Sequence, residues 1–260
     1  MKRKNLAFNL VFSALGSLII IFVILPLIST LLSTTPIAFL NSFSDPEVLK
    51  SIGLTFGAAA ISTFLALFTG VPLAYLLARR NFRGKRLLEA IINLPVVIPH
   101  TAAGIALLLV FGRRGMLGRW LSPLGITFTD NLAGIVVAML FVSLPFLVNM
   151  SRESFALVDE EYEKVAFTDG ASKFQAFIHV SLPLAWRGVL GGAVMMWARG
   201  ISEFGAVVIL AYHPKIATLL VYERFNVFGL EAAQPIALLL ILVALFVFIL
   251  LRLALLPKHD

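Results

Sequence analysis

Few side chains of this sequence could do chemistry, and the most unusual of them lie inside apolar segments. Arg199 and Glu203 are four residues apart in one apolar run. Residues at this spacing share a helix face, so the two side chains can form an ion pair. Charges within a membrane segment usually face the bundle interior and often mark a transport pathway. Two roles therefore stay open for Arg199 and Glu203: a structural ion pair that holds the bundle, and a gate.

A second apolar run contains Pro95 and Pro99, followed directly by His100. Each proline removes one backbone hydrogen bond from a helix. A helix that is broken at membrane depth usually lines protein or a cavity. The two prolines are therefore pathway candidates, and His100 is either a hydrogen-bonded packing residue or part of a gate.

The remaining chemistry-bearing residues do not form a catalytic or metal-binding pattern. The chain has no cysteine, and its four histidines are scattered. This excludes disulfides and thiolate metal sites. It has no G-x-x-x-x-G-K-[ST] phosphate loop, because Gly84-Lys85-Arg86 lacks both the upstream glycine and the Ser or Thr. We therefore expect that the chain is not an enzyme and binds no cofactor of its own.

The composition is that of an integral membrane protein. The hydrophobic fraction is 60% and the mean hydropathy is +0.97, against about 45–50% apolar residues in soluble domains. A helix needs about 20 mostly apolar residues to cross a bilayer. Six runs meet this requirement, at 7–32, 52–78, 88–111, 131–150, 183–211 and 233–256. The sequence predicts an all-α fold with six transmembrane helices in a single domain over 1–260.

The distribution of Lys and Arg predicts the orientation of these spans. If both termini are cytoplasmic, the inside segments hold 14 of the 21 Lys and Arg residues and the outside segments hold six. This asymmetry favours cytoplasmic termini. It also accounts for most of the net charge of +7 without a nucleic-acid partner. Arg113, Arg114 and Arg119 form an outside basic cluster, which is either a solvated loop or attracts an anionic ligand or an acidic partner.

The most polar part of the chain is the segment 159–182, between the fourth and fifth spans. Asp159 is suited to cap a helix, and Gly170 to end or bend it. Ser172 and Gln175 match a capping box for a second short helix. Pro183 suits the first turn of the next span, where its missing N–H is harmless.

The second short helix of this segment has an apolar face formed by Phe174, Phe177 and Ile178. So short a helix is marginal alone, and burying each of these side chains could contribute about 1.5–3 kcal/mol. Something must therefore cover this face. The cover is either the membrane domain or lipid interface of the same protein, or a cytosolic partner.

The segment resembles the cytoplasmic loop of ABC importer permeases, whose pattern is Glu-Ala-Ala, three residues, Gly, about nine residues, then Ile-x-Leu-Pro. Glu163 lies one residue before the usual Glu position, where Lys164 stands, so apolar contacts are expected to matter more than this charge. The residues expected to couple to the ATPase are Glu163, Ala166, Gly170, Ala171, Ser172, Phe174, Phe177, Ile178, Leu182 and Pro183. The resemblance implies that the second short helix docks on a separate ATPase subunit, which binds ATP and magnesium.

Three further stretches are very similar to the molybdate/tungstate permeases, with sulfate permeases as close relatives. They are Asn93 to Leu107, Ala138 to Ser143 and Trp197 to Ala206. The resemblance implies a prokaryotic plasma-membrane importer built from two permease copies, two ATPase subunits and an external oxyanion-binding protein. A sulfate/thiosulfate permease is the first alternative. An ATP-independent secondary transporter is the second, although the inverted repeat of such proteins is not evident.

Overall fold

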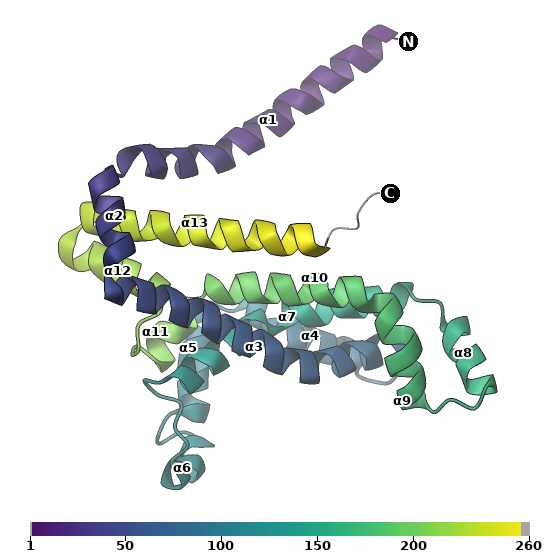
Figure 1. The fold of residues 1–260 in the computed structure, drawn as a ribbon. Helices are drawn as coiled ribbons and strands as arrows, with labels where there is room; N and C mark the ends of the chain where they lie inside the picture. The colour runs from purple at the N-terminus through teal and green to yellow at the C-terminus, as the bar shows by residue number, and fades with distance from the viewer. Residues whose placement is uncertain (1, 256–260) are drawn as a thin grey trace.

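The computed structural model describes residues 2–255, and it describes side chains for 8–251 and 253. Within this part of the chain all regular structure is helical (Figure 1). The five longest helices are α1 (Lys2–Ser33), α3 (Pro46–Arg79), α7 (Leu132–Leu157), α10 (Leu182–Ile201) and α13 (Leu230–Leu255). The shorter ones are α2 (Pro36–Ser44), α4 (Lys85–Val97), α5 (His100–Phe111), α6 (Gly118–Leu121), α8 (Glu160–Thr168), α9 (Lys173–Ala176), α11 (Gly205–Leu210) and α12 (Ala217–Phe228), with a 3₁₀ turn at Ser122–Leu124 and a π-helical turn at Phe177–Ser181.

The centre of the molecule is formed by α3, α7 and α10, which lie side by side (Figure 1). Small residues allow the helix backbones to approach closely. A Cβ atom on Gly192 would lie 3.1 Å from the carbonyl oxygen of Leu147, and one on Gly200 would lie 3.2 Å from the Cβ of Ala59. Glycine at these positions of α10 therefore sets its distance from α7 and from α3.

The number and type of spans agree with the sequence prediction of an all-α membrane protein. Five helices are long and apolar enough to cross a bilayer, and α4 with α5 makes a sixth if this bent pair counts as one span. The two helix axes differ by 113°. The break lies at Ile98 and Pro99, whereas Pro95 is accommodated inside α4. Of the two prolines in the third run, only Pro99 thus marks the break.

The fifth span is not the continuous helix over 183–211 that apolar content predicts. Helix α10 ends at Ile201, and α11 begins at Gly205. Phe204 between them has φ −136° and ψ −53°, which is outside helical geometry. The side chain of Glu203 accepts a hydrogen bond from the Ala206 N–H at 2.8 Å. It therefore satisfies one of the donors that the start of a new helix leaves free.

Pro183 lies in the first turn of α10, as the sequence predicts, but the chain is already helical from Lys173, so the fifth span has no separate start there. Since Pro183 has no N–H, the helix accommodates it through a wider π turn just before it. In this turn the Leu182 N–H donates to the carbonyl oxygen of Phe177. Motion of α9 can therefore pass into α10 without a flexible joint.

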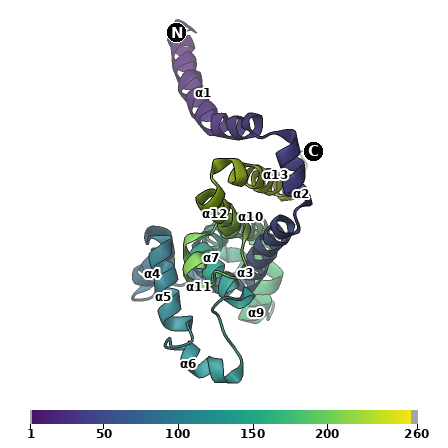
Figure 2. The same ribbon diagram turned by 90° about the vertical axis from the view of Figure 1, so that its left-hand side faces the viewer.

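The two ends of the molecule carry different short helices (Figure 1). Helices α8 and α9 project at one end, whereas α2 and α12 lie at the other. Helix α1 extends away from the body in both views (Figures 1 and 2). Its apolar window Phe8–Ser33 has no residue buried within this chain. The fold therefore leaves this apolar window to be covered from outside the chain.

Candidate functional site

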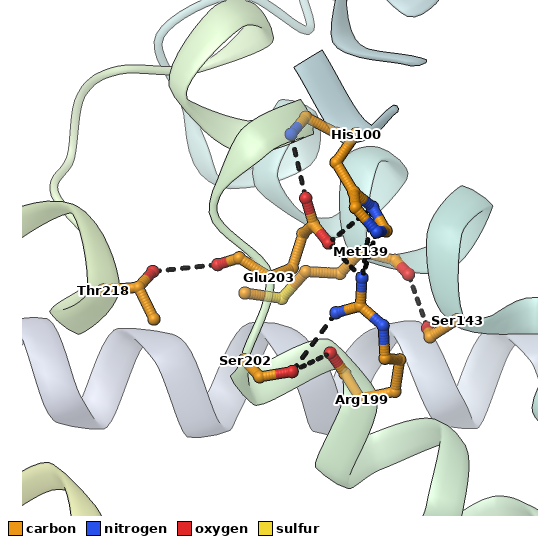
Figure 3. A network of polar contacts seen from close by, with 8 residues as sticks. His100, Met139, Ser143, Arg199, Ser202, Glu203 and Thr218 are labelled. Atoms are coloured by element: carbon orange, nitrogen blue, oxygen red, sulfur yellow. Dashed lines mark hydrogen bonds and ion pairs between the residues drawn. The ribbon is translucent and has the colours of Figure 1, made fainter. Parts of the chain in front are cut away.

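The ionisable residues expected at the pathway meet where the two broken spans cross. Figure 3 shows His100, Arg199 and Glu203 converging from α5, α10 and the connection between α10 and α11. Arg199 Nη2 lies 2.9 Å from Glu203 Oε2, and 3.1 and 2.9 Å from His100 Nδ1 and Nε2. His100 Nδ1 lies 3.3 Å from Glu203 Oε2. The structure thus brings together the three ionisable residues that the sequence singled out as pathway candidates.

Close helix packing fixes this crossing. A Cβ atom on Gly104 would lie 2.8 Å from the Cβ of Ile209, and one on Gly205 would lie 2.7 Å from the Cβ of His100. Such distances are shorter than real contacts, so α5 and α11 approach each other only because both positions are glycine. The Thr218 hydroxyl donates to the carbonyl oxygen of Glu203 at 2.8 Å, which also ties the connection to α12. The ionisable residues are therefore held by rigid elements.

The three side chains differ in how far they are covered. The Glu203 side chain is 1% exposed, that of Arg199 is 21% exposed and that of His100 is 38% exposed. Ser202, whose hydroxyl accepts from Arg199 Nη1 at 3.2 Å, is exposed as well. The carboxylate is thus covered within this chain, whereas the guanidinium and the imidazole remain partly accessible.

The two prolines in the pathway prediction take different places. Pro99 is exposed and immediately precedes His100 at the start of α5. Pro95 is buried within α4. Pro99 therefore positions His100 directly, and Pro95 is placed to shape α4 alone.

The second candidate region is the segment 159–182, where the local capping predictions are confirmed. Asp159 accepts from the Glu161 N–H at 2.9 Å. Gly170 has φ +86°, a left-handed conformation that favours glycine. Ser172 and Gln175 form the full capping box at the start of α9. The segment therefore has the helix, glycine break and short helix that the sequence indicates.

The apolar face formed by Phe174 in α9 and by Phe177 and Ile178 in the π-helical turn divides in two. Phe174 is 73% exposed and points away from the chain's own contacts. Phe177 is half-buried, and its ring centroid lies 4.8 Å from that of Tyr75 and 6.0 Å from that of Phe155. Ile178 is half-buried as well. Phe177 therefore belongs to the anchor of the segment on the membrane body, and Phe174 is the aromatic residue left free for a partner.

The other residues expected in this surface lie around Phe174. Ala166 and Ala171 are half-buried and line, with Gly170, a groove of about 340 Å³ between α8 and α9. Ser172 and Pro183 are exposed, and Leu182 is half-buried. The groove and Phe174 together form an open surface at the tip of the molecule.

Glu163 is turned inward and anchors the segment on α3. Its carboxylate accepts from Ser181 Oγ at 2.6 Å, from Arg79 Nε at 2.7 Å and from Tyr75 Oη at 2.9 Å. Burial raises the pKa of Glu163, but the hydrogen bonds from Ser181, Arg79 and Tyr75 and the Arg79 charge outweigh it and hold the pKa below its ordinary value. Although apolar contacts are expected to matter more than this charge, Glu163 does form a buried ion pair with Arg79 inside the chain.

The sequence did not identify the partners of Glu163. Tyr75 and Arg79 lie 88 and 84 residues away in the chain, and Ser181 lies 18 residues away. Arg79 was recognised only as one of the basic residues that indicate orientation. Its position one helical turn after Tyr75 is the signal that both face the same neighbour.

These features, an all-helical membrane body with two broken spans and a capped helix–glycine–helix segment at one end, define a membrane transport component. The model of the family described as "Binding-protein-dependent transport system inner membrane component" matches residues 70–256. The chain belongs to this family.

Similar proteins agree with this assignment. A molybdate/tungstate transport system permease protein of Pyrococcus abyssi is 43% identical over 93% of each chain. A probable sulfate transport system permease protein of Nephroselmis olivacea is 31% identical over 80% of this chain and 74% of the relative. Among solved structures, a bacterial ABC transporter involved in alginate import matches with a TM-score of 0.75, covering 96% of both chains at 16% identity. This last likeness concerns the fold.

Proposed function

We propose that the chain is the permease subunit of an ATP-driven importer for molybdate and tungstate. The observation that carries the proposal is the segment 159–182, because it combines a rigid anchor at Glu163 with an exposed Phe174 at the tip of α9. A helical surface of this kind suits a groove on a partner protein. We assign this surface to the ATPase because the segment resembles the cytoplasmic loop of ABC importer permeases.

The substrate is proposed from the relatives together with the charges in the membrane body. The relative of Pyrococcus abyssi is named for molybdate and tungstate. Both ions are tetrahedral dianions, which suits a pathway that contains Arg199 and His100. Sulfate is also a tetrahedral dianion, and the relative named for sulfate transport makes a sulfate/thiosulfate permease the second candidate.

The assembly that we propose contains two copies of this chain, two ATPase subunits and one external oxyanion-binding protein. A second copy or membrane lipid covers α1, whose apolar window is not buried within its own chain. ATP and magnesium are bound by the ATPase. A groove of about 610 Å³ lined by Glu47, Lys50 and Lys215 lies at the end opposite α9 and suits a charged partner such as the binding protein. Both termini are cytoplasmic, in a prokaryotic plasma membrane.

In the proposed cycle, ATP binding draws the two ATPase subunits together and moves the two copies of α9 with them. The movement passes through the continuous helix Lys173–Ile201 and through the Glu163 contact to α3. The path then opens outward to receive the oxyanion, and hydrolysis returns it to the inward state.

The experiment is co-purification of the ATPase with a Phe174→Asp permease. Burial of a phenylalanine contributes about 1.5–3 kcal/mol, so its loss should weaken docking by roughly tenfold or more. The matched control is Phe228→Asp, since Phe228 is 64% exposed on α12 at the opposite end. Phe177 is left intact because it packs on Tyr75 and Phe155. Undiminished ATPase in the Phe174→Asp preparation would refute the assignment of α9 as the coupling helix.

A further inference from the structure

The cluster of His100, Arg199 and Glu203 has the groups of an anion-binding site. The Glu203 carboxylate already occupies part of the hydrogen-bonding capacity of the Arg199 guanidinium. Arg199 Nη2 is shared between Glu203 Oε2 at 2.9 Å and the imidazole of His100. Its Nη1 donates to the Ser202 hydroxyl at 3.2 Å. Glu203 is in turn fixed by the Ala206 N–H at 2.8 Å. The carboxylate is therefore held by the Ala206 N–H, while the guanidinium contacts both Glu203 and His100.

The open side of this cluster presents hydrogen-bond donors and positive charge. Arg199 and His100 are 21% and 38% exposed, and Glu203 is 1% exposed. An anion approaching from the open side meets the guanidinium and the imidazole before it meets the carboxylate. A fully ionised tetrahedral oxyanion only accepts hydrogen bonds, and guanidinium groups bind oxyanions well.

The buried carboxylate limits how tightly such an ion can be held. It offsets the charge of Arg199 through a contact of 2.9 Å. Conduction requires binding that is favourable enough for entry and weak enough for release. Glu203 provides this balance, because Arg199 returns to it when the ion leaves.

We propose that Arg199 and His100 form a transient binding site for a tetrahedral oxyanion dianion within the membrane body, and that Glu203 is the built-in competitor that keeps this binding weak. The inference rests on the proposed function, from which it takes the substrate class. It assigns opposite effects to the two members of the ion pair, whereas a purely structural pair would give both substitutions the same effect.

The test measures binding of tungstate to the purified permease–ATPase complex in detergent, without the binding protein. Glu203→Gln keeps the size of the side chain and an acceptor for Ala206, but it removes the negative charge. Tungstate should then bind at least about tenfold more tightly than to the wild type, since the repulsion between one carboxylate and a dianion about 8 Å away has an effect larger than this at an effective dielectric of about 20. Uptake by the same variant in proteoliposomes should slow, because release is slower.

Arg199→Gln is the matched control of opposite sign. It should remove tungstate binding both alone and in combination with Glu203→Gln. If both single variants lose tungstate binding, or if the double variant retains the tight binding, the proposal is overturned. A short-chain phosphatidylglycerol is tested as a competitor that carries a phosphate ester. If this lipid displaces tungstate at a lower concentration than molybdate does, the proposal is also overturned.

A second substitution guards against misfolding of Glu203→Gln. His100→Lys places a permanent positive charge at a half-exposed position and leaves the buried carboxylate in place. It should tighten tungstate binding in the same direction, and unchanged or weaker binding would contradict the proposal. ATP-dependent uptake by the wild type distinguishes failure of the proposed function from failure of the proposed oxyanion site. Its absence refutes the proposed function, whereas normal uptake with no effect of these variants on tungstate binding refutes only this site.

Discussion

Replacing Glu163 with Gln should release the segment 159–182 from the membrane body. The carboxylate is 9% exposed and accepts three hydrogen bonds, from Tyr75, Arg79 and Ser181. The two hydroxyl groups can turn to accept from the new amide, but the guanidinium has no acceptor function. Arg79 Nη2 is already buried without a hydrogen-bond partner among the described residues. The cost therefore falls on Arg79, which becomes an uncompensated buried charge.

The size of this effect follows from the burial of the ion pair. Removal of one member of a buried pair costs about 3–5 kcal/mol. Each 1.4 kcal/mol is a factor of ten in an equilibrium constant. Opening of the segment should therefore become roughly a hundredfold to a few thousandfold more frequent. Hydrogen exchange of the amides in α8 and the π-helical turn, measured on the full chain by mass spectrometry, reports this opening directly.

The control for this measurement is Glu161→Gln. Glu161 pairs with Lys164 at 3.0 Å, but both side chains are well exposed, at 69% and 61%. Exposed pairs contribute little, so exchange should match that of the wild type. If Glu163→Gln also exchanges at the wild-type rate, the buried network does not hold the segment and the reasoning is refuted.

The same contact predicts a dependence on pH. The pKa of Glu163 lies below its ordinary value in the folded protein. Its stabilising contribution is therefore complete above the unfolded value of about 4.3 and is lost as the pH falls through the folded value. The difference in opening free energy between wild type and Glu163→Gln should narrow as the pH is lowered through this range. A difference that stays constant there would contradict the assigned charge state.

Two further predictions concern the crossing of α5 and α11 and the opposite end of the protein. Gly205→Ala should lower the apparent Tm in detergent through about 1–3 kcal/mol of overpacking, because its Cβ would lie 2.7 Å from that of His100. Gly57→Ala should leave the Tm unchanged, because a Cβ atom at this position would have no atom within 4 Å. Equal Tm shifts for the two variants would contradict the proposed role of close packing. Lys215 donates to Glu223 at 2.7 Å, and this bond raises the pKa of Lys215 and lowers that of Glu223. Lys215→Met should therefore lower the apparent Tm most between about pH 5 and 10. The difference should shrink as the pH rises through the Lys215 value or falls through that of Glu223, and a difference independent of pH would exclude the ion pair as its cause.

Local capping and proline chemistry could be predicted from the sequence because their causes lie within a few residues. Asp159, Gly170 and the Ser172–Gln175 box act on the adjacent backbone. The break at Pro99 follows in the same way from a missing donor. Apolar runs of about 20 residues located the spans for a comparable reason, since bilayer thickness sets their length.

The break in the fifth span could not be predicted by hydropathy, because apolar residues continue on both sides of it and no proline lies between Ile201 and Gly205. What ends α10 there is a tertiary arrangement. Glu203 caps the new helix and pairs with Arg199, while α11 packs against α5 through Gly104. The ion pair itself was predictable from its spacing, but the third member, His100, comes from a separate span and required the fold.

The different burial of Phe174 in α9 and Phe177 in the π-helical turn is a second feature that only the fold determines. Phe174 and Phe177 are both phenylalanines on the same predicted helix face, so the sequence does not distinguish them. Only Phe177 packs on Tyr75 and Phe155. The inward turn of Glu163 likewise depends on Arg79 in α3. Such long-range pairings are not visible in local patterns.

The central claim, that this chain carries oxyanions only when coupled to an ATPase through α9, is tested most directly by uptake of radiolabelled molybdate into proteoliposomes. The vesicles contain the permease, its ATPase and the external binding protein, with ATP supplied on the side of the ATPase. We predict uptake that requires ATP and is reduced by Phe174→Asp. Equal uptake without the ATPase, driven by an ion gradient, would contradict the account and would support a secondary transporter.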